Sequence, residues 1–338
     1  MVMDQVEQAV EQFGLRGRRI LVAVSGGVDS TALLHALMDL SVPQDLVLAV
    51  GHVQHGLRGE DSRKDEEAVQ ALAEDQGLKA YVIKADPRPA REEQRGRARL
   101  TLQEAARELR SGALEQMAHE WGADHIATAH HLDDQVETIL MRLLRGTGPT
   151  GLQGIEHQSA DGRWIRPLLA VSREEIMEFA HQRGLRWRED ASNESDAYTR
   201  NRLRHHWIPA LREEFNPQLL RAVGRLADAM QEEEVWIRSV IEEVSQRMTR
   251  QGDEPGLKRL VWSEKGWSEL PNGLALRVIR HNLHQVGRGR DVSRVHLQRV
   301  VDFLRRDDVE TGKAVELPGG DRVVRTATGY HLELDPRS

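Results

Sequence analysis

The sequence predicts an α/β protein in which a parallel sheet with helices on both faces is followed by a long helical connector and a small α+β domain. In the first half of the chain, short apolar runs alternate with amphipathic helical patterns, as in strands joined by crossover helices. Residues 217–250 form one long, strongly charged helical pattern, and beyond Gly256 helices precede short strands. We therefore expect a catalytic domain at 1–215, a connector at 216–250 and a second domain at 251–338.

The individual elements follow from the spacing of apolar residues. Apolar runs predict strands at 20–24, 46–53, 79–83 and 125–129. Helical spacing predicts a helix carrying Leu33, Leu34, Leu37 and Leu40, and further helices at 61–76, 100–119, 132–144, 172–183 and 199–213. In the last domain we expect helices at 274–285 and 295–306 and strands at 314–317 and 323–334.

Composition narrows the class of protein. The 338 residues are 39% hydrophobic and 30% charged, which suits about two domains with a sizeable core. No apolar run is long enough to span a bilayer and no signal peptide is visible, so we expect a cytoplasmic protein without a membrane partner. The chain has no cysteine, which excludes disulfides, thiolate zinc sites and persulfide chemistry.

The net charge of −7 argues against a nucleic-acid partner, but two local patches argue for one. Residues 84–110 carry eight Lys/Arg against five Asp/Glu, and residues 183–212 carry seven Arg against four Asp/Glu. Trp187, Trp207, His205 and His206 lie within the second patch. Arginines interleaved with aromatic residues fit RNA binding, although solvated helix faces remain the alternative for either patch alone.

A glycine-rich loop predicts a phosphate site. Residues 25–30, Ser-Gly-Gly-Val-Asp-Ser, follow the first strand and open a helix, where backbone N–H groups and the helix dipole attract anions. Gly26 and Gly27 allow close approach of the backbone, and Asp29 can hold Mg²⁺ against phosphates. The lysine of a Walker loop is absent, which suits pyrophosphate as a leaving group. A tight turn capped by Ser25 is the structural alternative.

A second motif follows the fourth strand. At about 100° per residue, the helix from Leu132 places its apolar residues on one face and its polar residues on the other. The expected apolar face is Leu132, Val136, Ile139 and Leu143, and the polar side that should converge on a ligand is His130, Asp134 and Glu137. The spacing matches no zinc template, and an acidic first helical turn is the alternative reading.

The glycine loop resembles the PP-loop of the N-type ATP pyrophosphatases, which split ATP into AMP and pyrophosphate. Further segments make the resemblance more specific. In chain order they are His52-Val53-Gln54-His55-Gly56-Leu57-Arg58, Ala106-Arg107-Glu108-Leu109-Arg110, Asp190-Ala191-Ser192-Asn193 and Arg200-Asn201-Arg202-Leu203-Arg204. With His130-x-x-x-Asp134-x-x-Glu137 they resemble the tRNA(Ile)-lysidine synthases over about the first 215 residues. Ser111 departs from the tyrosine common in that family, so no role is carried over to it.

The resemblance implies a reaction and a set of site residues. ATP adenylates the wobble cytidine of an isoleucine tRNA, and the ε-amine of free L-lysine then displaces AMP to give lysidine. The implied ATP-binding residues are Ser25, Gly26, Gly27, Val28, Asp29, Ser30 and His52, with Mg²⁺ held by Asp29 through the phosphates. The implied lysine-binding residues are Arg107, Asp134 and Glu137. The implied catalytic residues are these three together with Asp29 and His130. Arg95, Arg97, Arg200 and Arg204 are expected to contact tRNA, and a homodimer is expected from the resemblance alone.

Three other functions were weighed against this one. A tRNA thiolase with the same loop passes sulfur through cysteines or an iron–sulfur cluster, which a chain without cysteine lacks. A small-molecule amidating synthetase would normally need an ammonia-supplying domain, and another PP-loop adenylating synthetase acting on a different tRNA base or small molecule stays the alternative. A non-catalytic nucleotide sensor would not need Asp29, Ser30, Asp134 and Glu137 together.

Overall fold

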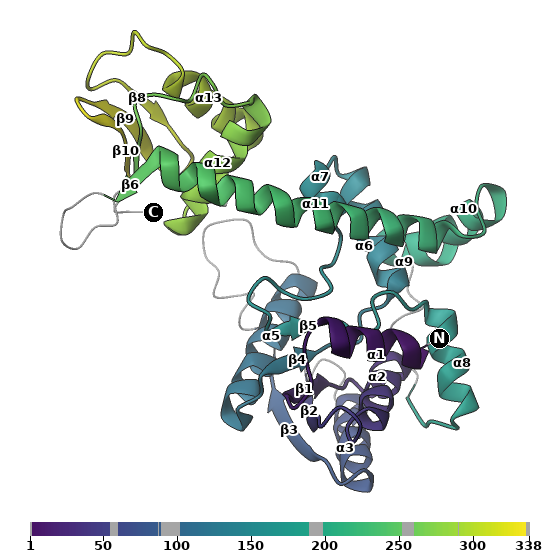
Figure 1. Cartoon of the computed structure of the whole chain (residues 1–338). Coiled ribbons are helices and arrows are strands. Elements are labelled where there is room, and N and C mark those ends of the chain that lie inside the picture. Colours follow the sequence, from purple (N-terminus) through teal and green to yellow (C-terminus); the bar gives the residue numbers. More distant parts are fainter. Residues whose placement is uncertain are drawn as a thin grey trace. The chain divides into compact units, whose positions relative to one another are not determined.

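The structure is a computed structural model that describes residues 2–54, 60–86, 88, 102–188, 199–251, 260–289 and 291–335. The chain divides into two compact units, Met1–Gln231 and Glu232–Ser338. The division falls within the long helix α11 (Leu219–Met248), whose ends lie two residues inside the helical pattern at 217–250 (Figure 1). None of the helices in these ranges combines the length and apolar character that a membrane span requires.

The first unit is built on a five-stranded parallel sheet with the order β3-β2-β1-β4-β5. Its strands are β1 (Arg19–Ala23), β2 (Val47–Gln54), β3 (Lys79–Lys84), β4 (His125–Ala127) and β5 (Trp164–Ile165). Its helices are α1 (Val2–Gln12), α2 (Val28–Asp39), α3 (Glu60–Asp75), α5 (Leu102–Trp121), α6 (Leu132–Leu144), α7 (Pro149–Leu152), α8 (Arg173–Gln182), α9 (Thr199–Arg202), the π-helical turn η2 (Leu203–Trp207) and α10 (Ile208–Glu214).

Helices cover both faces of this sheet, as predicted. Because side chains alternate along a strand, Ile20 and Val22 of β1 face one cluster, which includes residues of α1, α2, α3 and α8. Leu21 and Ala23 face the opposite cluster, which includes residues of α5. Burial on both faces explains why the central strands appear in the sequence as continuous apolar runs.

Some elements differ from those expected. Neither the two-residue strand β5 nor the helices α1 and α7 were among the expected elements. The helix expected at 199–213 is divided into α9, η2 and α10. Leu143 was expected on the apolar face of α6, which is wrong because its side chain is exposed near the end of the helix.

The loop 151–155, which includes the last two residues of α7, is held by side chains from two helices. Gln135 of α6 donates to the carbonyl of Ile155 and accepts from its N–H, and Gln231 of α11 donates to the carbonyls of Gln153 and Ile155. Arg142 donates to the carbonyls of Gly151 and Gly154. Gly154 has a φ of 65°, a left-handed conformation that favours glycine.

The second unit contains a five-stranded antiparallel sheet with the order β6-β7-β10-β9-β8. Its elements are β6 (Thr249–Gln251), β7 (Leu260–Trp262), α12 (Asn272–Gln285), α13 (Arg294–Leu304), β8 (Ala314–Glu316), β9 (Arg322–Thr326) and β10 (Gly329–Glu333). Trp262, Trp267 and Tyr330 are fully buried in its core with residues of both helices. The α+β prediction is confirmed, and the strand expected at 323–334 is the hairpin β9–β10.

Candidate active site

The strand order explains why two distant motifs meet. β1 pairs with β2 on one side and with β4 on the other, so the order of the sheet reverses between β1 and β4. The register pairs Ile20 with His125 and Val22 with Ala127, which brings the carboxyl ends of both strands to the same edge. The loop 25–30 leaves β1 there, and residues 128–134 leave β4 there. Parallel sheets bind ligands at such a reversal.

The loop 25–30 is built to leave backbone N–H groups available. Ser30 Oγ donates to the carbonyl of Gly27 at 3.0 Å and accepts from the N–H of Ser25 at 3.1 Å, which closes the turn. Gly26 has a φ of 92°, which a residue with a side chain rarely adopts. Within the described residues no side chain caps the N-terminus of α2 at Gly27. The first N–H groups of α2 therefore suit a phosphate.

His52 and His130 border this loop from neighbouring strands. The buried His52 donates from Nδ1 to the carbonyl of Val24 at 2.8 Å, just before the loop begins. Its Nε2 is buried and has no hydrogen-bond partner among the described residues. Nδ1 of His130 lies 2.9 Å from the hydroxyl of Thr128. Both rings thus stand at the edge where a nucleotide would bind.

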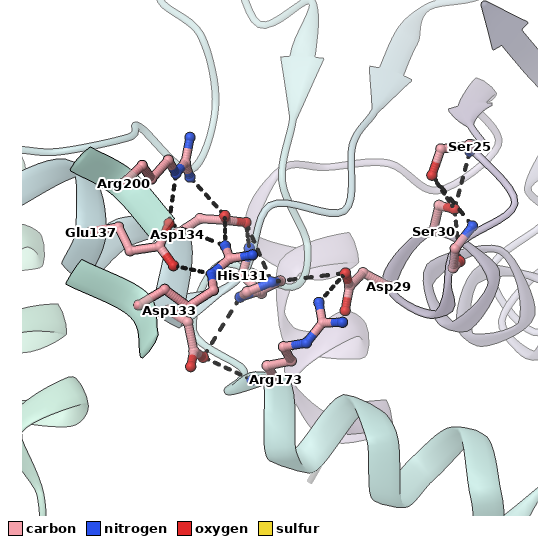
Figure 2. A network of polar contacts seen from close by, with 11 residues as sticks. Ser25, Asp29, Ser30, His131, Asp133, Asp134, Glu137, Arg173 and Arg200 are labelled. Atoms are coloured by element: carbon pink, nitrogen blue, oxygen red, sulfur yellow. Dashed lines mark hydrogen bonds and ion pairs between the residues drawn. The ribbon is translucent and has the colours of Figure 1, made fainter. Parts of the chain in front are cut away.

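Asp134 and Glu137 converge, as the helical spacing predicted, but two arginines lie against them. Arg200 reaches Glu137 Oε2 with Nε at 2.6 Å and Asp134 Oδ1 with Nη2 at 2.8 Å. Arg204 reaches Glu137 Oε1 at 2.5 Å and Asp134 Oδ1 at 3.3 Å. Figure 2 shows Arg200 above the two carboxylates. We call Asp134 and Glu137 the acid pair.

His131 links the acid pair to the phosphate loop. This buried ring lies 3.9 Å from Asp29 Oδ2 and 3.5 Å from Asp134 Oδ2 through Nε2, and 3.6 Å from Asp133 Oδ2 through Nδ1. Arg173 contacts two of the same carboxylates. Its guanidinium is 2.8 Å from Asp29 Oδ2, and its main-chain N–H donates to Asp133 Oδ2 at 2.8 Å. The loop, α6 and the start of α8 therefore share one polar network (Figure 2).

The pKa values of the two adjacent histidines, His130 and His131, are shifted in opposite directions. Burial lowers the pKa of His130 to about 3; Asp134 opposes this shift, and Arg110, Arg166 and Arg107 reinforce it. Burial also disfavours the charged form of His131, but Asp133, Asp134 and Asp29 more than compensate, so the pKa of His131 is raised. Burial opposes ionisation of Asp134 as well, and nearby His131 and Arg200 nevertheless lower its pKa. At neutral pH His130 is thus an uncharged imidazole among fixed charges.

A resident metal would have few protein ligands here. Among the described residues no group of three or more His, Asp or Glu side chains is arranged to hold a metal ion. Asp29 Oδ1, however, is buried and accepts no hydrogen bond from the described residues. A carboxylate oxygen in that state fits Mg²⁺, which takes one or two protein carboxylates and completes its shell with phosphates and water.

Comparison with known proteins identifies both units. A family model described as the PP-loop domain matches residues 2–211, and one described as the TilS substrate binding domain matches residues 265–329. The tRNA(Ile)-lysidine synthase of Bacillus cereus is 33% identical over 332 residues, covering 96% of this chain and 67% of that protein. The chain belongs to the tRNA(Ile)-lysidine synthase family. The enzyme of the same name from Solibacter usitatus is 37% identical over 308 residues, covering 90% and 65%.

The chain thus spans about two thirds of the length of these tRNA(Ile)-lysidine synthases. Among solved structures, the U34-tRNA thiolase NcsA from Methanococcus maripaludis, with its [4Fe-4S] cluster, has a TM-score of 0.55 at 16% identity. The match covers 67% of this chain and 78% of that one. At this identity it supports the PP-loop fold, in agreement with the parallel sheet described above.

Several residues expected in a lysidine synthase site fall elsewhere or outside the description. Arg107 is exposed on α5, and its charge is one of those that lower the pKa of His130. Arg200 and Arg204, which are expected to contact tRNA, form ion pairs with the acid pair in this structure. Arg95 and Arg97 lie outside the described residues, as do the motif residues 55–58 and 190–193.

Sequence reasoning missed His131 and Arg173. His131 stands beside His130, which the helical spacing placed on the polar side with Asp134 and Glu137, and the pattern therefore passed over His131. Asp134 Oδ2 accepts from the N–H of His131 at 3.2 Å, so the residue starts the helix, and a polar residue before an acidic first turn is the signal that could have marked it. Arg173 has no comparable signal because its contact with Asp29 spans 144 residues.

Proposed function

We propose that this chain ligates free L-lysine to the wobble cytidine of tRNA(Ile), through an adenylated cytidine, at the expense of ATP. Membership of the lysidine synthase family supports the proposal. The observation that carries it is the network around His131, which joins a phosphate loop to a buried acid pair at one sheet edge. An enzyme that first activates a base with ATP and then delivers an amine needs both subsites within reach of one atom.

The phosphate loop serves the first step. The cytidine carbonyl oxygen attacks the α-phosphorus of ATP, and the bond to pyrophosphate breaks. N–H groups at the start of α2 receive the pyrophosphate charge as it develops, and Arg173 holds Asp29 in place. Mg²⁺, held by Asp29 and the phosphates, would supply charge neutralisation for the leaving group. The neutral His130 lies where it can donate to a phosphate oxygen without adding a competing charge.

The acid pair serves the second step. The ε-amine of lysine attacks the activated ring carbon, AMP leaves, and the amine gives up a proton. Lysine amines have a reference pKa of about 10.4, so a carboxylate that accepts the proton favours attack. Glu137 and Asp134 offer such carboxylates, but Arg200 and Arg204 compensate them in the structure. Lysine binding therefore requires at least one guanidinium to move, and Arg107 is the candidate for its carboxylate.

Other adenylating functions fit the chain less well. The thiolase alternative lacks a sulfur carrier, because the chain contains no cysteine. A PP-loop synthetase acting on another tRNA base or on a small molecule is not favoured by relatives that share the name lysidine synthase over most of this chain. A homodimer and a cytoplasmic location stay predictions.

The test is AMP formation by the full chain in three reaction mixtures: complete, with a uridine tRNA, and without RNA. AMP and lysidine should form when ATP, Mg²⁺, lysine and tRNA(Ile) with a wobble cytidine are all present. The same tRNA with uridine at that position is the matched control and should give neither product. AMP formed without RNA, or from the uridine tRNA at the same rate, would show that this chain acts on another substrate.

A further inference from the structure

The segment α9–η2–α10 has two faces of different chemistry. On its buried side, Leu203 and Ile208 pack against Leu132 and Val136 of α6 in one hydrophobic cluster. From the same segment, Arg200 and Arg204 reach the acid pair. Packing on α6 therefore fixes the segment beside the proposed reaction site (Figure 1). The turn η2 is π-helical, a local widening that occurs frequently at functional sites.

The exposed part of this segment presents an aromatic side chain beside an arginine and two histidines. Trp207 is 62% exposed at the end of η2. Arg202, His205 and His206 are exposed on the same turns. Residues 199–207 contain three arginines and two histidines and no acidic residue, in a chain whose net charge is −7. An isolated exposed tryptophan would call for no explanation, but here the surrounding charge is complementary to phosphate.

We propose that Trp207 is a stacking platform for an unpaired base of the RNA loop that carries the target cytidine, with Arg202 contacting the adjoining phosphate. This inference rests on the proposed function. A cytidine that enters the site must leave its stack, and its neighbours in the loop then lose a stacking partner. Proteins that bind single-stranded RNA supply aromatic faces to such bases and arginines to the backbone.

The position of Trp207 favours a base next to the target. Trp207 lies three residues beyond Arg204, at the other end of η2. The guanidinium of Arg204 is itself within 2.5 Å of Glu137, where lysine is proposed to bind. One end of the turn therefore reaches the reaction site, and the other end faces solvent. A loop that inserts one base into the site would bring a neighbouring base over the tryptophan.

The test compares two exposed tryptophans of the full chain. Trp207→Ala should weaken binding of an isoleucine tRNA anticodon stem-loop about tenfold, the effect of losing one stacked base. Trp207→Phe should restore most of the affinity. Trp236→Ala is the matched control, because Trp236 is 67% exposed on α11 but follows Glu232, Glu233 and Glu234. That variant should bind as the unmodified chain does.

Salt dependence separates stacking from charge. Trp207→Ala should leave the log–log slope of affinity against salt unchanged, whereas Arg202→Gln should flatten it by about 0.7 for a single-stranded contact. Equal RNA affinity of Trp207→Ala and the unmodified chain, with lysidine still formed, would overturn the stacking inference alone. So would a loss of self-association in that variant, measured by sedimentation, with unchanged RNA affinity. Failure of the unmodified chain both to bind the RNA and to form lysidine would overturn the proposed function.

Discussion

Glu137 and Arg204 form a two-point ion pair, with Nε 2.5 Å from Oε1 and Nη2 3.1 Å from Oε2. The Glu137 side chain is 1% exposed, so its charge is compensated by Arg204 and Arg200 rather than by water. A buried carboxylate left without a partner would cost several kcal/mol. The arginines therefore stabilise the folded chain, and they compete with any amine that the acid pair binds.

This competition predicts a gain of lysine affinity on removal of Arg200. Arg200→Gln leaves Glu137 paired with Arg204 but frees one side of the acid pair. Lysine should bind the RNA-free chain about tenfold more tightly, since one charge-assisted hydrogen-bonded partner no longer has to be displaced. Titration calorimetry with lysine measures this directly. Arg212→Gln, the same change on α10, is the control and should bind lysine as the unmodified chain does. Weaker binding by Arg200→Gln would mean that the arginines orient the acids for lysine.

The phosphate loop depends on the charge of Asp29. Asp29→Asn keeps the shape of the side chain but should reduce AMP formation at least about 100-fold, because the anchor for a cation at the departing pyrophosphate is lost. Asp39→Asn is the matched control on the same helix, where Asp39 pairs with Arg183. It should turn over normally. Near-normal AMP formation by Asp29→Asn, with circular dichroism showing both variants folded, would remove Asp29 from the catalytic set.

The low pKa of His130 predicts a dependence of stability on pH. Below pH 6.5 the unfolded chain binds a proton at His130, whereas the folded chain does not until the pH approaches 3. Stability is therefore lost as the pH falls. His130→Asn should reduce the loss in unfolding free energy between pH 7.5 and pH 5 by about 2 kcal/mol, as seen in urea titrations at both pH values. The same loss in the variant and the unmodified chain would mean that His130 is already charged when folded.

The arginines of the second unit are expected to fall into two groups. Arg305 donates to the carbonyls of Trp267 and Leu270 and to Asn272 Oδ1, so it is structural. Arg277, Arg288 and Arg306 pair with Glu234, Asp321 and Asp308. Arg280, Arg294 and Arg299 are exposed and form no ion pair within the described residues. They are the better candidates for contact with tRNA.

Replacing those three arginines together with glutamine should flatten the salt dependence of tRNA binding by about two to three units. Arg305→Gln should instead lower the melting temperature and leave the slope unchanged, since it removes internal hydrogen bonds. Filter binding over a series of salt concentrations and thermal unfolding of each full-length variant give the two readouts. An unchanged slope in the triple variant would leave tRNA recognition to the first unit.

The sequence predicted the parallel sheet because its central strands are buried on both faces and are therefore uniformly apolar. It failed at β5, whose two residues are too few to form a pattern, and at Leu143, where periodicity continued past the end of the buried surface. The convergence of Asp134 and Glu137 followed from helical geometry alone. Their pairing with Arg200 and Arg204 did not, because the partners lie 63 to 70 residues apart and meet only when η2 packs on α6.

The loop 151–155 has a consequence for tolerance to mutation. The hydrogen bonds from Gln135, Arg142 and Gln231 end on main-chain groups, which every amino acid provides. A Cβ at position 154, in contrast, would collide with the side-chain oxygen of Gln135. A Cβ at position 151 would likewise collide with the side chain of Thr147. A library randomised over these five codons and selected for folded protein should therefore return glycine at 151 and 154 and broader diversity at 152, 153 and 155. Randomising position 135 should return few residues other than glutamine, although Gln135 lies outside the loop. Its side chain makes the hydrogen bonds that fix the backbone of the loop.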